Sequence, residues 1–281
     1  MWWVRACFKV FMRPLLFIIG LTWIRRKYLH INDVIAYYRP PRNIKNAPIV
    51  VSNHTSYLDM FYFMSTNVSF LAKAEVAKTF FIGMFAIARQ SIFIERESEE
   101  NREKVVELIK ERAERIHRHE DIPPLMIFPE GTVTNGRSLM SFKKGAFITG
   151  DPIKIFTLKY NPHWTQIISS IANISPLFTV ILSMSQPLNT LEITEYVDFL
   201  DPVWVYQKHN VRQEDEKAWE YVAEEVKKLM AFASGFETTE ESFRDTIEQE
   251  KLLSMYNDTF FPRKTRPDHI VEMSPQNKKE K

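Results

Sequence analysis

Short apolar runs and a long amphipathic stretch alternate along this chain. The apolar runs are bounded by turn residues and predict buried strands at 48–51, 68–72, 91–94, 125–128 and 153–158. Residues 99–118 are rich in charge but keep an apolar stripe at helical spacing, which predicts a surface helix with a solvated outer face. The alternation predicts an α/β fold, with a mixed, mostly parallel sheet flanked by helices and functional residues at strand ends.

The remaining apolar segments extend this pattern. Residues 80–88 predict either a helix or a membrane-facing surface. Residues 167–184 form the longest apolar stretch, but a central proline and several polar groups oppose a membrane span, so we expect a helix followed by a strand. A strand is predicted at 191–199, and the apolar stripe of 219–233 predicts a helix that ends at Gly235, a C′ glycine.

The first 45 residues combine aromatic and aliphatic side chains with many basic ones. The apolar run 14–24 is too short for a bilayer, which needs roughly 20 apolar residues, and no small-residue cleavage site follows it. The basic charge suits an anionic membrane surface or a nucleic acid, and the apolar content favours the membrane. We therefore predict a membrane-associated helical segment that lies in the interface, with a buried core helix as the alternative.

Composition adds wider limits. The 281 residues, 45% of them hydrophobic, suffice for one large domain with appendages. The formal net charge of +2 conceals the basic N-terminal block. A lone cysteine, Cys7, rules out an intrachain disulfide and fits a reducing compartment. The sequence contains no glycine-rich phosphate loop and no His-Glu-x-x-His or paired Cys-x-x-Cys pattern, so we predict no metal and no bound cofactor.

The run 48–51 leads into the stretch that carries the candidate chemistry. It breaks at Ser52 into what resembles a helix start, where Ser56 and Asp59 have the spacing of a capping box. His54 then lies just outside the helix N-terminus. In a uniform helix, residues five apart stand roughly 140° from each other, so His54 and Asp59 can meet only if His54 is on the turn.

A histidine with a carboxylate against one ring nitrogen can act as a general base toward a hydroxyl group. The carboxylate selects the tautomer, orients the ring and stabilises the imidazolium. A helix N-terminus disfavours positive charge on His54 and helps to keep its ring neutral. On spacing alone, a turn histidine beside half of a capping box explains His54 and Asp59 equally well.

A second stretch decides between these interpretations. The run 125–128 ends in Pro129-Glu130-Gly131-Thr132. The pattern Asn53-His54-x-x-x-x-Asp59 followed by Phe128-Pro129-Glu130-Gly131-Thr132 resembles the glycerolipid acyltransferase family, whose members use acyl-CoA. The segments 54–59, 128–135 and 142–147 are most similar to its lysophosphatidylcholine acyltransferase-like branch, and the likeness extends with gaps from Pro48 to Gly235.

The resemblance implies a role for each matching residue. His54 and Asp59 are the implied catalytic residues. The implied substrate-binding residues are Arg96, Glu130, Gly131, Thr132 and Lys73, with Arg96 and the weaker candidate Lys73 directed at a phosphate. Where many relatives carry a glycine, an arginine and a proline, this chain has Gln90, Val133 and Ile155. These departures weaken the assignment of substrate class more than that of the fold.

Together, pattern and resemblance predict the domain organisation. We expect a basic-apolar membrane-anchoring segment at 1–45, an acyltransferase domain at 46–235, a C-terminal helical extension at 236–261 and a disordered tail at 262–281.

The expected activity is acyl transfer from acyl-CoA, the co-substrate, to the hydroxyl of a lysophosphatidylcholine-like lysophospholipid. Backbone amides after His54 are candidate oxyanion donors. The expected partners are acyl-CoA, a lysophospholipid and the bilayer, without nucleic acid, at an endoplasmic reticulum membrane with the active site facing the cytosol. Alternatives are acylation of lysophosphatidic acid or glycerol 3-phosphate, a thioesterase, and an inactive lipid-binding protein.

Overall fold

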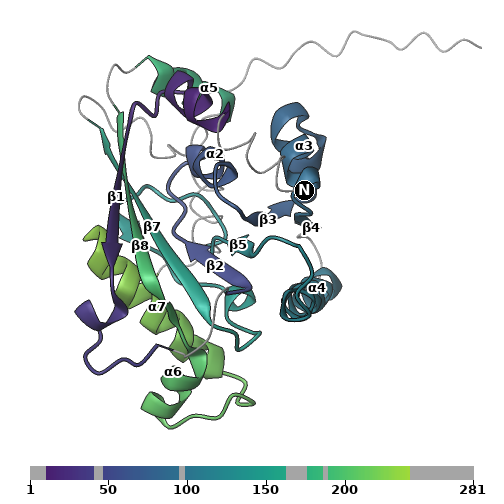
Figure 1. The fold of residues 1–281 in the computed structure, drawn as a ribbon, viewed down its shortest axis with the longest axis vertical. Coiled ribbons are helices and arrows are strands. Elements are labelled where there is room, and N and C mark those ends of the chain that lie inside the picture. The colour runs from purple at the N-terminus through teal and green to yellow at the C-terminus, as the bar shows by residue number, and fades with distance from the viewer. Residues whose placement is uncertain (1–10, 41–46, 95–98, 163–175, 186–188, 241–281) are drawn as a thin grey trace, which may run out of the picture. The chain divides into compact units, whose positions relative to one another are not determined.

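The computed structural model of the protein describes residues 11–40, 47–94, 99–162, 176–185 and 189–240. Within these ranges, seven strands form one sheet in the order β1-β8-β7-β2-β5-β3-β4 (Figure 1). Every neighbouring pair is parallel except β7 and β8, which are antiparallel. The prediction of a mixed, mostly parallel sheet is confirmed.

The strands of this sheet are β1 (Trp23–Leu29), β2 (Ile49–Ser52), β3 (Ser69–Lys73), β4 (Ile92–Ile94), β5 (Leu125–Ile127), β7 (Ile153–Pro162) and β8 (Asn189–Leu200). A second sheet pairs β6 (Ser138–Leu139) with β9 (Glu237–Thr238). The helices are α2 (Leu58–Met64), α3 (Phe80–Ala88), α4 (Glu99–His117), α5 (Pro176–Met184), α6 (Pro202–His209) and α7 (Ala218–Ser234). Short 3-10 helices are η1 (Ile31–Asp33), η2 (Ala74–Lys78) and η3 (Lys144–Ala146).

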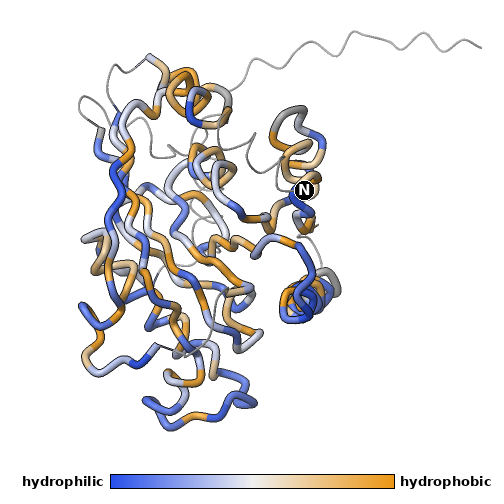
Figure 2. Tube along the Cα trace, viewed as in Figure 1, coloured by the Kyte–Doolittle hydropathy of each residue, from blue (hydrophilic) through white to orange (hydrophobic). Residues whose placement is uncertain are grey.

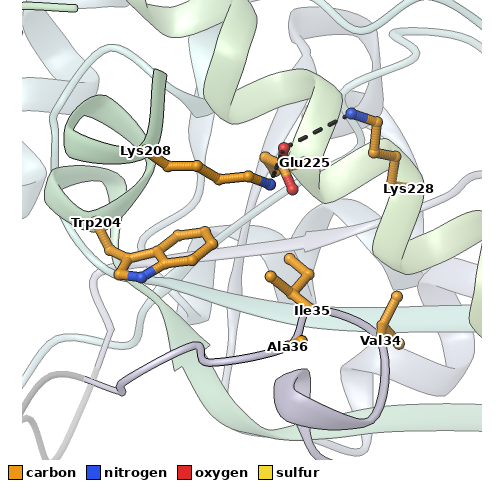
Figure 3. A pocket seen from close by; sticks show the side chains of 7 residues that line it. All are labelled: Val34, Ile35, Ala36, Trp204, Lys208, Glu225 and Lys228. Carbon is orange, nitrogen blue, oxygen red and sulfur yellow. Dashed lines mark hydrogen bonds and ion pairs between the residues drawn. The ribbon is translucent and has the colours of Figure 1, made fainter. Parts of the chain in front are cut away.

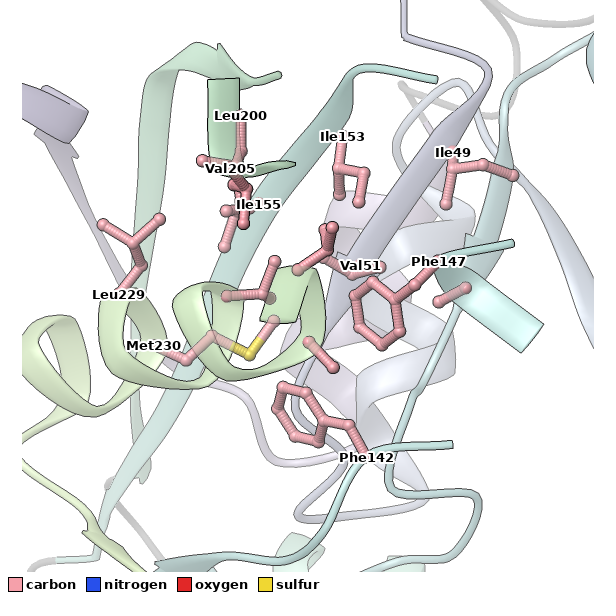
Figure 4. Close-up of a cluster of buried hydrophobic side chains, with 14 of the residues drawn as sticks. Ile49, Val51, Phe142, Phe147, Ile153, Ile155, Leu200, Val205, Leu229 and Met230 are labelled. Atoms are coloured by element: carbon pink, nitrogen blue, oxygen red, sulfur yellow. The ribbon is translucent and has the colours of Figure 1, made fainter. Parts of the chain in front are cut away.

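Alternating side chains of the central strands supply two cores, one on each face of the sheet. Ile49 and Val51 of β2 pack with Leu229 of α7 in the cluster drawn in Figure 4. Val50, between them in sequence, belongs to the opposite core, with Leu58 of α2. Because helices cover both faces of these parallel strands, each reads as a continuous apolar run. Figure 2 shows the same apolar character along the central strands and along α5.

The N-terminal apolar run 14–24 is divided between two elements. Residues 11–18 are helical, and β1 begins at Trp23 and pairs in register with β8. The hydrophobic pattern did not predict β1. Because β1 pairs with β8, residues 23–29 belong to the main sheet and not to a separate segment that precedes it. In the part of the chain that the structure describes, every helix is too short or too polar to cross a membrane. Membrane anchoring by residues 1–45 stays a prediction.

Two other predictions need correction. The stretch 167–184, expected as a helix followed by a strand, ends in helix α5, and its Pro176 is the first residue of that helix, where a proline is tolerated. Residues 237–238, at the start of the predicted helical extension 236–261, form strand β9 beside β6, and a helix farther along the extension stays a prediction. Residues 163–175, with the other half of the long apolar stretch, lie outside the described residues, as do 241–281 with the predicted tail.

Candidate active site

The site begins where β2 ends, and Asn53 extends the pairing of that strand by one residue. Its side-chain Nδ2 donates to the Leu158 carbonyl at 2.8 Å, and the Leu158 N–H donates to its Oδ1 at 2.8 Å. The Asn53 amide therefore replaces a backbone peptide in the ladder with β7. This contact holds the turn that starts at His54 against the strand next to it.

His54 and Asp59 meet across this turn. His54 Nδ1 lies 2.9 Å from Asp59 Oδ2. The contact is possible because α2 begins only at Leu58, so His54 precedes the helix, as the spacing argument required. Half of the predicted capping box is present, since the Ser56 N–H donates to Asp59 Oδ2 at 3.0 Å. The other half is not formed, because Ser56 Oγ accepts from the Leu58 N–H at 3.2 Å and the Asp59 N–H donates to the Ser56 carbonyl.

Asp59 is completely buried, and four donors surround its carboxylate. Besides His54, Oδ2 accepts the N–H groups of Thr55, at 2.8 Å, and Ser56. Oδ1 accepts the hydroxyl of Tyr160, from β7. Because a carboxylate only accepts hydrogen bonds, His54 Nδ1 carries the hydrogen, and its Nε2 keeps a free lone pair. The N–H groups of Thr55 and Ser56, two of the candidate oxyanion donors, thus bind Asp59 in this structure.

The His54 ring lies in apolar surroundings but is not sealed. It stacks on Phe128 with ring centroids 4.1 Å apart and an interplanar angle of 16°. Its side chain is 13% exposed, whereas Asp59 is 0% exposed. Phe63 packs edge-on against both Phe128 and Phe156, at centroid distances of 6.0 Å and 5.7 Å. A base with one accessible edge among aromatic rings suits a substrate that is largely apolar.

Glu130, from the second motif, binds the main chain of the first. Its Oε1 accepts the His54 N–H at 2.9 Å and its Oε2 accepts the Met140 N–H at 3.1 Å. Burial raises the pKa of Glu130 to about 7, although these two N–H bonds oppose the rise. Both carboxylate oxygens thus brace the peptide backbone. The implied role of Glu130 in binding substrate stays a prediction.

The loop after β5 also holds the other side of the His54 peptide unit. The Thr134 N–H donates to the His54 carbonyl at 2.7 Å, and Thr134 Oγ1 donates to the same oxygen at 3.2 Å. Gly131 has φ +74°, and a Cβ there would collide with the end of the Lys143 side chain. Thr132 is half-buried in this loop. The two sequence motifs therefore form one hydrogen-bonded unit around His54.

Lys73, one of the predicted phosphate-binding residues, lies along the same edge of the sheet. Phe70 of β3 pairs with Met126 of β5, so the exposed Lys73 at the end of β3 reaches the edge at which Glu130 leaves β5. Lys73 is paired with Ile94, the last residue of β4. Arg96 follows two positions later and lies outside the described residues.

The site differs from the hollow of about 430 Å³ seen at the opposite end of the sheet (Figure 3). That hollow is lined by Val34, Ile35, Ala36, Trp204, Lys208, Glu225 and Lys228. The hollow lies near α6, which follows the end of β8. The last residue of β8, Leu200, pairs with Ile153 at the beginning of β7. His54, by contrast, follows the end of β2. In the part of the chain that the structure covers, no cluster of three His, Cys, Asp or Glu side chains could hold a metal ion.

The part of the chain that carries this site matches a known family. Residues 33–154, which include His54, Asp59 and Glu130, match the Acyltransferase family model. Lysophospholipid acyltransferase LPEAT2 of Arabidopsis thaliana is 36% identical over 213 residues, 75% of this chain and 35% of the relative. Lysophosphatidylcholine acyltransferase 1 of Danio rerio is 32% identical over 246 residues, 87% of this chain and 43% of the relative.

A remote likeness is found to the crystal structure of the 1-acyl-sn-glycerophosphate acyltransferase PlsC from Thermotoga maritima. Its TM-score is 0.49 at 17% identity, over 80% of this chain and 77% of that one.

These matches confirm the resemblance to the glycerolipid acyltransferase family, whose Acyltransferase model matches residues 33–154. The relatives named above support the likeness to its lysophosphatidylcholine acyltransferase-like branch, which the sequence motifs indicated. The chain spans 35% and 43% of the lengths of these two relatives.

Proposed function

We propose that this protein transfers an acyl group from acyl-CoA to the free hydroxyl of a lysophospholipid. The observation that carries the proposal is the contact of 2.9 Å between His54 Nδ1 and the buried Asp59 carboxylate, which leaves Nε2 as a proton acceptor. The names of the family and of the two relatives support the reaction class. A lysophosphatidylcholine-like acceptor is the favoured substrate.

The proposed reaction needs one base and no acyl-enzyme. His54 Nε2 takes the proton of the lipid hydroxyl while the hydroxyl oxygen attacks the thioester carbonyl carbon. The tetrahedral intermediate collapses with cleavage of the C–S bond, and the coenzyme A thiolate takes the proton back from the imidazolium. Asp59 remains ionised throughout and stabilises the imidazolium.

Phosphate recognition in this proposal is assigned to the edge formed by β3 and β4. Lys73 brings an exposed ammonium group to the carboxyl end of β3, and Arg96 follows β4 directly. A guanidinium group binds phosphate through two parallel hydrogen bonds, and an ammonium group adds a point charge. Val133 stands where many family members have an arginine, so these two side chains carry the positive charge in its place.

We further propose that the site works at a membrane surface. The helix 11–18 and α5 lie side by side (Figure 1), and Ser183 Oγ donates to the Ile19 carbonyl at 2.7 Å. Their outer faces expose large apolar side chains, namely Phe11, Phe17, Ile18, Phe178, Ile181 and Met184. Arg25, Arg26 and Lys27 are exposed on the neighbouring strand β1. An apolar surface beside basic residues fits an anionic membrane such as the cytosolic face of the endoplasmic reticulum.

The reaction is tested with labelled acyl-CoA and purified protein on lipid vesicles. The acceptor panel contains lysophosphatidylcholine, lysophosphatidic acid and glycerol 3-phosphate, and both new ester and free fatty acid are measured. We expect labelled phosphatidylcholine to form fastest. Transfer mainly to another acceptor would overturn the substrate assignment. Fatty acid without new ester would indicate a thioesterase, and no turnover with any acceptor would contradict the enzyme proposal.

The membrane proposal is tested by flotation with vesicles that contain anionic lipid. Phe17→Ser combined with Phe178→Ser should reduce vesicle binding, because both rings lie on the exposed apolar face. Phe232→Ser is the matched control, since Phe232 of α7 is 58% exposed on a different helix. Equal binding by wild type, the double variant and the control would contradict membrane docking through this face.

A further inference from the structure

A tyrosine of strand β7, Tyr160, contacts the site. It lies outside the two sequence motifs. Leu158 and Tyr160 point to the core that also contains α2, because side chains alternate along a strand. The two hydrogen bonds between Asn53 and Leu158 set the register of the His54 turn against β7. Tyr160, two positions farther along, then places its hydroxyl on Asp59 Oδ1.

The two oxygens of Asp59 have different donors. Oδ2 accepts His54 Nδ1 and the N–H groups of Thr55 and Ser56. Oδ1, on the opposite side of the planar carboxylate, accepts the Tyr160 hydroxyl. A donor on Oδ1 restricts rotation about the bond to the carboxyl carbon and so keeps Oδ2 in line with the imidazole. The dipole of the Tyr160 hydroxyl also weakens the attraction between the Asp59 carboxylate and the imidazolium of His54.

We propose that Tyr160 is a positioning residue for acyl transfer, which acts through Asp59 to orient the His54 ring and to set its strength as a base. This inference rests on the proposed function of the His54 site. Tyr160 need not touch the substrate, and its hydroxyl neither gains nor loses a proton in the reaction.

The titratable groups around Asp59 agree with this role. They are His54 from the turn, Tyr160 from β7 and Glu130 from the loop after β5. Burial, together with the charge of Asp59, holds the pKa of Tyr160 well above its usual range. Tyr160 therefore remains a hydrogen-bond donor over the pH range in which acyl transfer would be assayed.

The test compares two phenylalanine variants that each lose one tyrosine hydroxyl. Tyr160→Phe removes the donor to Asp59, whereas Tyr196→Phe removes a buried hydroxyl on β8 that donates to the Leu229 carbonyl at 2.7 Å. We expect kcat to fall about tenfold in Tyr160→Phe with KM for acyl-CoA unchanged, because a hydrogen bond to a charged group is lost. The acidic limb of the kcat/KM profile should move to higher pH. Tyr196→Phe should change neither.

A spectroscopic measurement tests the same link without any need for turnover. The proton between His54 Nδ1 and Asp59 should give a strongly downfield NMR resonance, which should shift in Tyr160→Phe and remain in place in Tyr196→Phe. If the wild-type protein transfers no acyl group but the resonance responds as expected, the proposed function fails and the link between Tyr160 and His54 stands.

Replacement of Tyr160 alone by 3-fluorotyrosine covers the case in which Tyr160→Phe fails to fold. Fluorine makes the hydroxyl a stronger donor and keeps the ring, so the acidic limb should move to lower pH. A kcat and a pH profile equal to those of the wild type in both Tyr160 variants, or the same changes in Tyr196→Phe, would overturn the proposal.

Discussion

Two buried carboxylates in this protein each contact a histidine ring, yet they lie in opposite electrostatic settings. Asp59 accepts from His54 and otherwise from neutral donors, two backbone N–H groups and a tyrosine hydroxyl. Glu225, at the other end of the sheet, accepts from Lys208 at 2.7 Å and from His209 at 3.1 Å, with Lys228 at 3.6 Å. A histidine beside a carboxylate is therefore insufficient to identify a catalytic base.

The two carboxylates differ in which groups balance their negative charge. Lysines neutralise Glu225, so its histidine is one hydrogen-bond partner among several. Burial acts to raise the pKa of Glu225, but hydrogen bonds from Lys208 and His209 outweigh it and hold that pKa below its usual range. The donors that contact Asp59 are the His54 ring, two backbone N–H groups and the Tyr160 hydroxyl, so its negative charge is directed at His54. Neutral donors leave the histidine as the partner whose protonation can change during a reaction.

The largest difference in turnover is expected between variants of the two histidines, His54 and His209. His54→Ala should lower turnover about a thousandfold or more, because general base catalysis is lost. His209→Ala should leave turnover near the wild-type value, since His209 contacts Glu225 and the Tyr221 ring at the other end of the sheet. Steady-state acyl transfer measures both, with circular dichroism to show that each variant is folded. Similar activity in the two variants would remove the distinction between the two pairs.

The carboxylates themselves should separate activity from stability. Asp59→Asn should lower kcat about a hundredfold, because an amide no longer selects the tautomer of His54. Glu225→Gln should leave kcat unchanged and lower the free energy of unfolding by about 1 kcal/mol, through weakened contacts with half-exposed lysines. Urea denaturation and acyl transfer give the two values. A loss of activity in Glu225→Gln alone would contradict the assignment.

The pH dependence of stability should have opposite signs at Glu130 and Glu225. Folded Glu130 keeps its proton up to about pH 7, whereas the unfolded chain releases it near the ordinary value of 4.5. The native state therefore binds more protons in this window, and the free energy of unfolding falls as pH rises through it, by about 2 kcal/mol. Glu130→Gln should remove this fall.

Glu225 should behave in the opposite way, because its folded pKa is lowered from 4.5. Its stabilising contribution is complete above the unfolded pKa and is lost as pH falls through the folded one. Glu225→Gln should therefore reduce the pH dependence of the free energy of unfolding only at acid pH. Denaturant titrations from pH 4 to 8 distinguish the two, and identical curves for both variants would refute the contrast.

The smallest effect concerns the loop that braces His54. Gly131→Ala should destabilise the protein by about 1 kcal/mol or more, because position 131 has φ +74° and the new Cβ meets Lys143. Gly145→Ala is the matched control, since its Cβ would meet only Ile109 Cδ1, at an ordinary 3.7 Å. Thermal unfolding compares the two. Equal melting temperatures would show that the loop tolerates a side chain at Gly131.

Local signals in the sequence were sufficient for the central strands and for the His54–Asp59 pair. Strands buried on both faces are apolar throughout, and the pair is separated by a single turn. The pattern missed β1, whose sequence Trp-Ile-Arg-Arg-Lys-Tyr-Leu is mostly exposed and which pairs with β8, far along the chain. It also missed Tyr160, because this residue reaches Asp59 only through the register of β7, across 101 positions.

Glu130 is a second example of a contact that the sequence could not predict. The resemblance implied a role for Glu130 in substrate binding, which stays a prediction. The contacts of its two oxygens with the backbone N–H groups of His54 and Met140 are visible only in the structure. Sequence patterns identify which residues a site contains. Which atoms they bind depends on how β2 and β5 lie next to each other in the sheet.

The most direct test of His54 as the base is a single-turnover experiment with radiolabelled acyl-CoA, enzyme in excess and lysophosphatidylcholine on vesicles. Aliquots quenched in acid are analysed for labelled phospholipid and for label bound to protein. We predict that wild-type protein moves the label directly to phospholipid and that His54→Ala leaves it on coenzyme A. Label trapped on the protein, or transfer by His54→Ala at the wild-type rate, would contradict the account.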